Sequence, residues 1–311
     1  MEREEWLKRR KCGIGGSDVA ALLGVSPWRT ALDVYYDKVD APREEEETEA
    51  MRIGTELEDY VAKSYERYTG LRVVRYNSLL VRGHSIGNLD RLVIPAGEKV
   101  AAVRTEIRTD TLLECKTSSS NRWDDVPEHY ICQVQHYMGL TERLQHADVA
   151  ALFLGLRKEF AVYSIERDNS LISAMQEAVE AFWAEHVEKR IPPPPANEAD
   201  CRRLWEAHEP GKIAEADDAL AEVAARLRVV TDEIKDKEKV VEELRGQLMS
   251  AMGDAETLMH GADKLATWKN NKPSTRTDWQ ALAERLEPSE ELVKEFTITK
   301  PGARVFRLAA K

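Results

Sequence analysis

Apolar side chains recur at helical and strand-like spacings along the first part of the chain. Residues 50–68 carry apolar side chains every three or four positions, which predicts an amphipathic helix, and Gly70 follows where a helix commonly ends. Residues 86–94 and 111–116 are short runs rich in apolar residues, which predicts two strands. The alternation predicts an α/β (α+β) fold with a mixed central sheet flanked by helices.

The same alternation continues through a helix predicted at 169–189. Further strands are predicted at 71–76, 79–81, 149–156 and 159–166, and a further helix at 127–138. An abrupt boundary follows, because the four consecutive prolines at 192–195 cannot continue a helix and favour a stiff, extended chain. We therefore expect one domain over residues 1–191 and a proline-rich linker over 192–213.

Beyond the linker, residues 214–311 change character. Apolar residues alternate steps of three and four for about four heptads, which predicts coiled-coil-like helices. The seam consists of Leu220, Val223, Leu227, Val230, Ile234, Lys237, Val241, Leu244 and Leu248. A helix at 279–286 and β-like stretches at 264–268 and 296–308 complete this region. We expect an intramolecular helical hairpin or, alternatively, a surface for oligomerisation or partner docking.

Composition narrows the class of protein. Hydrophobic residues make up 42% and charged residues 32% of the 311 residues, and no apolar run is long enough to span a membrane. The first residues are highly charged and lack the apolar stretch of a signal peptide, so we expect a cytoplasmic protein. The formal net charge of −11 disfavours nucleic acid on average, although a local basic groove can still attract it. The four cysteines form no CxxC pair, which disfavours a zinc or iron–sulfur site.

The strand predicted at 111–116 carries the candidate chemistry. Glu114 and Lys116 are two positions apart, so both side chains project from one face of the strand while Cys115 points to the other. A carboxylate beside an ammonium on a half-buried strand is costly, and a divalent cation on Glu114 with a water near Lys116 would use both groups. Asp90, in the preceding strand-like run, is a candidate second carboxylate. Taken singly, an E-x-K run arises by chance, and Asp90 alone fits a turn or a strand edge.

Together these residues resemble the PD-(D/E)XK signature of metal-dependent nucleases, with Leu89 where the consensus has proline. The resemblance implies a restriction-endonuclease-like core in which Asp90, Glu114 and the backbone carbonyl of Cys115 bind Mg²⁺, with Mn²⁺ as a substitute. Hard oxygen ligands of this kind suit both ions. The resemblance also implies that Lys116 orients or deprotonates the attacking water.

Three flanking motifs make the chain similar to the YqaJ-type viral recombinases and the phage lambda exonuclease family. The first runs from Arg10 to Asp18 and on to Trp28. The resemblance implies that Arg10 and Ser17 hold a 5′-terminal phosphate, and the chemistry agrees: a guanidinium forks onto phosphate, and a helix N-terminus offers free N–H groups. The alternative is that Ser17 is only the N-cap of a helix that starts at Asp18, beside an unrelated surface arginine.

The other two motifs lie on predicted helices. Glu58 matches the family's glutamate that faces the metal site, against the alternative of a solvated acidic helix face. Gln133 and Gln135 resemble the family's Q-x-Q helix, and residues two apart on a helix diverge by about 200°, so only one can face the metals. The resemblance favours Gln135 near the scissile phosphate, with Gln133 as a less direct DNA contact.

Two tryptophans near these motifs, Trp28 and Trp123, could stack on nucleobases. Packing in the core or in a surface loop is the more ordinary role for both.

The resemblance implies a Mg²⁺-dependent 5′→3′ exonuclease that acts on double-stranded DNA ends and leaves a 3′ single-stranded tail for homologous recombination. It also implies a single-strand annealing protein of the RecT/Beta type as a partner, a homo-oligomer that closes as a trimer, and a phage or prophage origin in a bacterial cytoplasm. One alternative is an endonuclease of the same superfamily, against which the motif around Arg10 and Ser17 argues. The other is a non-catalytic DNA-binding or interaction module, against which the intact set of acidic residues and Lys116 argues.

Overall fold

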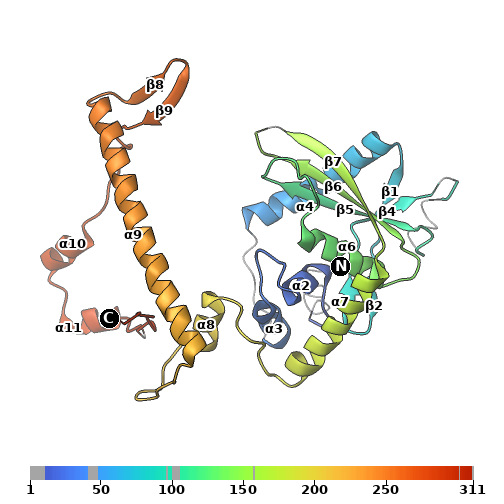
Figure 1. Cartoon of the computed structure of the whole chain (residues 1–311), viewed down its shortest axis with the longest axis horizontal. Helices are drawn as coiled ribbons and strands as arrows, with labels where there is room; N and C mark the ends of the chain where they lie inside the picture. Colours follow the sequence, from blue (N-terminus) through green and yellow to red (C-terminus); the bar gives the residue numbers. More distant parts are fainter. Residues whose placement is uncertain are drawn as a thin grey trace. The chain divides into compact units, whose positions relative to one another are not determined.

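A computed structural model describes residues 11–40, 48–95, 97–99, 106–156, 158–300 and 302–309. The chain divides into two compact units, Met1–Leu204 and Trp205–Lys311 (Figure 1). The division falls later than the predicted end of the first domain at residue 191, because the short helix α8 (Glu198–Leu204) packs on the first unit. Thr30 Oγ1 donates to Asp200 Oδ1 at 3.0 Å, and the Arg203 guanidinium lies 3.8 Å from the centre of the Tyr36 ring.

The first unit is built on a mixed sheet of five strands in the order β1-β4-β5-β6-β7. Only β5 and β6 pair in parallel, and the other neighbours are antiparallel. The strands β2 and β3 form a separate antiparallel hairpin. The strands are β1 (Arg72–Val74), β2 (Leu80–Arg82), β3 (Ser85–Gly87), β4 (Arg91–Ile94), β5 (Thr111–Ser118), β6 (His146–Phe153) and β7 (Glu159–Glu166).

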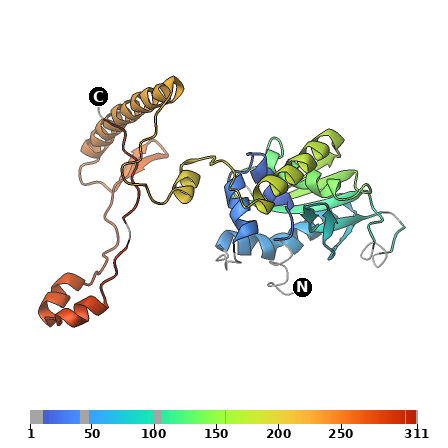
Figure 2. The same cartoon turned by 90° about the horizontal axis from the view of Figure 1, so that it is seen from below.

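Helices cover both faces of the sheet, as the two views of the first unit show (Figures 1 and 2). The helix α4 packs on one face, where its Val61 and Tyr65 meet Leu113 of β5. Leu112, one residue earlier in β5, points to the opposite face and enters the larger core, as the strand period of two requires. The helices are α2 (Gly16–Leu22), α3 (Ala31–Val39), α4 (Glu49–Thr69), α6 (Glu128–Gly139) and α7 (Asn169–Phe182), which continues as the π-helix η1 (Trp183–Glu188).

Local signals explain where the helices begin and end. Thr48 caps α4 by accepting from the backbone N–H of Met51, and Gly70 ends that helix in the left-handed region at φ 75°. The prediction that Ser17 caps a helix is wrong, because α2 begins one residue before it, at Gly16. The cap position is Gly15, whose backbone N–H donates to Asp18 Oδ2 at 3.2 Å.

In its described residues, the second unit contains one long helix, a hairpin and two short helices. Its elements are α9 (Asp218–Met252), β8 (Thr257–His260), β9 (Asp263–Thr267), α10 (Trp279–Leu286) and α11 (Glu290–Glu295). The predicted helix at 279–286 is confirmed. The strand predicted at 296–308 is wrong, since none of the described residues in that range is in a strand.

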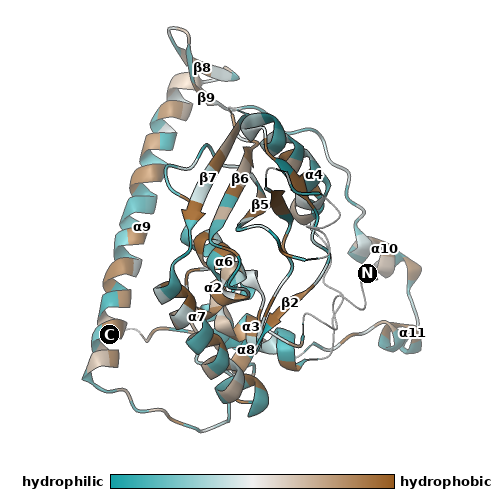
Figure 3. Cartoon of the chain, turned by 90° about the vertical axis from the view of Figure 1, so that its right-hand side faces the viewer, coloured by the Kyte–Doolittle hydropathy of each residue, from teal (hydrophilic) through white to brown (hydrophobic). Residues whose placement is uncertain are grey.

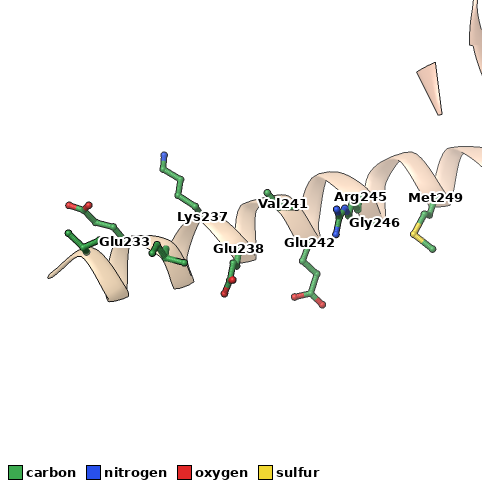
Figure 4. A pocket seen from close by; sticks show the side chains of 10 residues that line it. Glu233, Lys237, Glu238, Val241, Glu242, Arg245, Gly246 and Met249 are labelled. Atoms are coloured by element: carbon green, nitrogen blue, oxygen red, sulfur yellow. The ribbon is translucent and has the colours of Figure 1, made fainter. Parts of the chain in front are cut away.

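The heptad seam predicted for the second unit lies on α9, where all of its apolar side chains except the half-buried Val230 are exposed. Hydropathy colouring shows apolar positions recurring along α9 among polar ones, whereas the central strands of the first unit are mostly apolar (Figure 3). An open groove along this helix has charged residues such as Lys237, Glu238 and Arg245 beside apolar ones (Figure 4). Across the described residues, no helix is both long and apolar enough to cross a membrane.

The predicted fold class is therefore confirmed by the five-stranded mixed sheet flanked by helices. The helix predicted at 50–68 is α4, and the strand predicted at 111–116 is β5, each extended slightly at its ends. The run predicted as one strand at 86–94 is divided between β3 and β4 by a bend that contains Asp90. That bend allows Asp90 to turn toward β5.

Candidate metal-dependent nuclease site

Glu114 lies at the centre of a buried polar cluster on β5. Only 2% of the residue is exposed. Its Oε1 accepts hydrogen bonds from Lys116 Nζ at 2.7 Å and from Gln133 Nε2 at 2.7 Å. Its Oε2 is buried and has no hydrogen-bond partner among the described residues. A buried carboxylate oxygen without a partner is costly, so this atom marks a position where a ligand would be favourable.

Asp90 faces the same cluster from the bend before β4. Its Oδ2 accepts a hydrogen bond from the backbone N–H of Cys115 at 2.9 Å. Burial, together with the negative charge of Glu114, raises the pKa of Asp90 from 3.8 to about 8. Two carboxylates in one buried cluster are difficult to ionise together unless a cation neutralises them.

The backbone of Cys115 also faces Asp90. In a β-strand the N–H and C=O of one residue point to the same side, and the Cys115 N–H points to Asp90. The Cys115 carbonyl therefore lies toward Asp90, beyond the last residue pair between β4 and β5. The thiol contributes differently: it packs against the core under α4, and burial raises its pKa, so it is held as a neutral thiol.

Lys116 completes the cluster and is held in place by three groups. Besides its bond to Glu114, its Nζ donates to Gln133 Oε1 at 3.0 Å and lies 4.7 Å from the centre of the Tyr130 ring. Burial lowers the pKa of Lys116, but the charges of Glu114 and Asp90 outweigh that effect and raise it overall. The ammonium is therefore charged at neutral pH and is directed at the Glu114 carboxylate.

These groups fit a divalent metal ion. Asp90, the unpartnered Oε2 of Glu114 and the Cys115 carbonyl are hard oxygen donors, the type that Mg²⁺ and Mn²⁺ prefer. Side chains alone do not complete the site: the described part of the chain has no group of three or more His, Cys, Asp and Glu residues arranged for a metal. A backbone carbonyl, water and substrate oxygens would have to supply the remaining ligands, as is common for Mg²⁺.

Glu58 reaches this region from α4 but is paired with an arginine. Arg91 Nη1 donates to Glu58 Oε1 at 2.5 Å and to the backbone oxygen of Asp90 at 2.6 Å. Arg91 Nη2 donates to Asp59 Oδ1 at 2.5 Å, and only 4% of Arg91 is exposed. The structure thus ties α4 to the bend at Asp90 through Arg91, and the role of Glu58 as a metal ligand stays a prediction.

Of the two glutamines of α6, Gln133 and not Gln135 meets the cluster around Glu114. Gln133 contacts Glu114 and Lys116, as described above. Gln135 is turned away: its Nε2 donates to the backbone oxygen of Glu166 at 2.7 Å, and its Oε1 accepts from the backbone N–H of Asp168 at 2.9 Å. The expectation that Gln135 faces the metals is wrong, because both ends of its amide hold the connection from β7 to α7.

Of the two residues predicted to contact the phosphate, the structure describes Ser17 but not Arg10. Ser17 is exposed in the first turn of α2, and its neighbour Gly16 packs on α6 so tightly that a Cβ there would lie 2.9 Å from Gln133 Cγ. The start of α2 is therefore beside the cluster around Glu114. Arg10 lies outside the described residues, so its role as a phosphate contact stays a prediction.

The structure adds two residues that sequence reasoning missed. Arg91 follows Asp90 directly, and a charged residue in an apolar run was a signal that it would be paired. Tyr130 lies one helical turn before Gln133, which places both on one face of α6. Nothing in the sequence indicated that its ring would carry the Lys116 ammonium.

Residues 5–144 match the family described as the YqaJ-like viral recombinase domain. The chain is also similar to the uncharacterized protein YqaJ of Bacillus subtilis (strain 168), with 32% identity over 310 residues that cover 96% of this chain and 92% of that protein.

Two solved structures are similar at a lower level. One is an alkaline exonuclease, LHK-Exo, from Laribacter hongkongensis, with 25% identity and a TM-score of 0.47 over 60% of this chain and 93% of that one. The other is a phage-related exonuclease from Haemophilus somnus 129PT, with 14% identity and a TM-score of 0.42 over 60% of this chain and 100% of that one.

The likeness to YqaJ extends over almost the whole chain, including the second unit, and the matched domain contains Asp90, Glu114, Lys116 and Gln133. The predicted resemblance is confirmed, and with it the assignment as a deoxyribonuclease at the level of the family. Nucleases of this kind use a divalent metal, which agrees with the donor groups gathered around Glu114. The chain belongs to the YqaJ-like viral recombinase family.

Proposed function

We propose that this protein is a Mg²⁺-dependent 5′→3′ exonuclease that degrades one strand from double-stranded DNA ends and leaves a 3′ single-stranded tail. The observation that carries the proposal is the unpartnered, buried Oε2 of Glu114, which lies in one cluster with Asp90 and the Lys116 ammonium. A carboxylate pair that needs a cation, next to a positioned ammonium, is suited to phosphodiester hydrolysis.

Asp90, Glu114 and the Cys115 carbonyl would hold Mg²⁺, which when bound lowers the pKa of a coordinated water and offsets charge on the phosphate. Lys116 then exchanges its bond to Glu114 for one to the attacking water or to a phosphate oxygen. Gln133 keeps the ammonium in position, since its amide contacts both Lys116 and Glu114. Tyr130 borders the ammonium on another side and limits its motion.

The proposed 5′→3′ direction rests on a phosphate contact at the start of α2. Ser17 is exposed beside the cluster, and with Arg10 it would hold a 5′-terminal phosphate. A phosphate held at that point leaves the next phosphodiester near Glu114, which produces 5′→3′ polarity. An endonuclease has no need of such a terminal contact.

Digestion of matched DNA substrates tests the proposal. Linear duplex with 5′-phosphate ends, the same duplex with 5′-hydroxyl ends and closed circles are each incubated with Mg²⁺ or EDTA. We expect Mg²⁺-dependent loss of the 5′-phosphorylated linear DNA, slower loss of the hydroxyl form and survival of the circles. Cutting of the circles would replace the exonuclease with an endonuclease, and no cutting in any condition would remove the proposed activity.

The 3′ tail is a substrate for a single-strand annealing protein of the RecT/Beta type, which we propose as the functional partner. We further propose that the protein closes as a trimer around DNA, as family resemblance suggests. Light scattering of the purified full chain measures the oligomer directly, and a monomer at micromolar concentration would contradict the trimer. Co-purification with an added annealing protein of the RecT/Beta type tests the partner.

A further inference from the structure

We propose that Trp28 is a stacking platform for a nucleobase close to the cleavage site. The inference rests on the proposed function, because it takes a DNA strand to be present in the site. Trp28 is 69% exposed, although an indole is one of the largest apolar surfaces a residue can present to water. It lies in the loop between α2 and α3, and the next residue, Arg29, is paired with Asp18 beside Ser17.

Hydrogen bonds brace the backbone of the loop that carries Trp28. Ser26 Oγ accepts hydrogen bonds from the backbone N–H groups of Trp28 at 3.3 Å and Arg29 at 3.2 Å. The Arg29 guanidinium is anchored in turn to Asp18 at 2.8 Å and Asp37 at 2.7 Å. The exposed ring therefore projects from a braced turn, and little conformational entropy would be lost when a base stacks on it.

Aromatic contacts connect Trp28 to the catalytic cluster. Its ring meets the His129 ring edge-on at 4.7 Å, and His129 lies 4.1 Å from the ring of Tyr130. Tyr130 carries the Lys116 ammonium on its ring. The Trp28 ring is also 6.4 Å from the Tyr130 ring directly, centre to centre, so the indole lies next to the residue that carries the Lys116 ammonium.

Trp123 shows that exposure at Trp28 is not a general property of tryptophans in this unit. Trp123 contacts the rings of Tyr130, Phe153 and Tyr163, and it packs against the hydrophobic core. It supports Tyr130 from the protein side, and of these two tryptophans Trp28 has the accessible ring. Every base has a flat π face, so stacking here would bind DNA without sequence preference.

The test combines variants at Trp28 with DNA that lacks single bases. Trp28→Phe keeps an aromatic ring, Trp28→Leu keeps an apolar side chain that cannot stack, and Trp279→Leu on α10 changes a similarly exposed tryptophan (71%) in the second unit. Each full-length protein digests 5′-phosphorylated duplexes with an abasic nucleotide at one of the first four positions of either strand. We expect Trp28→Leu to raise KM by about 5- to 100-fold with little change in kcat, the effect of losing one stacked base.

The abasic series decides whether a base is involved. At one position, removing the base should abolish the difference between wild type and Trp28→Leu, while Trp28→Phe behaves like wild type and Trp279→Leu never differs. A Trp28→Leu effect of the same size on every abasic DNA, or no effect on any DNA, would overturn the inference.

A binding measurement in EDTA separates this inference from the proposed activity. Tryptophan fluorescence should be quenched by a short 5′-phosphorylated single-stranded oligonucleotide in wild type and less so in Trp28→Phe. Base-dependent quenching without any cleavage would contradict the proposed function alone. Normal cleavage without quenching or an abasic effect would contradict the platform alone.

Discussion

The two units of this chain use similar apolar residues in opposite ways. In the first unit Leu92 and Leu112 are fully buried between the sheet and the helices. In the second unit Ile234 and Leu244 follow a regular heptad pattern on α9, yet each remains 53% exposed. A periodic pattern establishes that a helix has an apolar face, but only a neighbouring element can cover that face.

The charged residues of the two units also differ in burial. Glu114 and Arg91 are almost completely buried in the first unit, and each is held by specific partners. The ion pairs along α9, such as Lys239 with Asp236, join residues one turn apart on an exposed surface. Buried charges of the first kind are strongly coupled to their surroundings, whereas exposed pairs contribute little.

The largest expected difference between the units is in catalysis. Replacing Lys116 with Ala should lower kcat by about 10²- to 10⁴-fold, because a positioned proton donor or acceptor is removed from the site. A single-turnover assay on 5′-phosphorylated duplex measures this effect. Lys239→Ala on α9 is the matched control and should retain the wild-type rate; a comparable loss in both variants would assign catalysis to the second unit as well.

A substitution in the core of the first unit should lower its stability. Replacing Leu92 with Ala leaves a cavity in the main core and should lower the free energy of unfolding by about 2–5 kcal/mol. Urea unfolding followed by circular dichroism measures the loss. A change below about 1 kcal/mol would mean that this core is far more adaptable than its complete burial indicates.

The affinity of the cluster around Glu114 for a metal ion should increase with pH. The pKa of Asp90 is raised from 3.8 to about 8, so the folded, metal-free protein holds a proton there that the unfolded chain releases. The bound proton on Asp90 therefore stabilises the folded state. Its contribution to the free energy of unfolding is complete below about pH 4 and is lost as the pH rises through 8. A metal ion displaces the proton, so the apparent metal affinity should rise about tenfold per pH unit below 8. Calorimetric titration from pH 6 to 9 measures it, and a flat profile in wild type would contradict the prediction.

The two glutamines of α6 should separate activity from stability. Gln133→Ala removes a contact to Lys116 and should lower kcat with a small change in stability, whereas Gln135→Ala should lower stability by about 1–3 kcal/mol with little change in kcat. Parallel thermal unfolding and digestion assays distinguish them. The opposite result would restore Gln135 to the site.

The smallest effect is expected on α9. Leu244→Ala removes a side chain that is 53% exposed, and it should change the stability of the full chain by less than about 0.5 kcal/mol. A loss near that expected for Leu92→Ala would show that the seam is covered in solution, by another copy of the chain or by a segment of its own. Light scattering of both proteins then separates these two cases.

The sequence by itself determined the type and approximate position of most elements and the residues of the E-x-K run. Periodicity is a local property, so α4, β5, β7 and α10 could be predicted from apolar spacing alone. The identity of Asp90, Glu114 and Lys116 as candidates also came from spacing and residue type. The partner of Asp90 in the cluster, the Cys115 backbone, follows from the strand that carries Glu114.

Only the tertiary structure decided which face of each element is turned to the site. Gln133 and Gln135 lie on one helix and are equivalent by composition, and the packing of α6 against α2 and β7 selects Gln133. The same holds for Arg91, whose three partners come from α4 and from the bend at Asp90. These choices depend on contacts between residues far apart in the chain, and local spacing carries no information about such contacts.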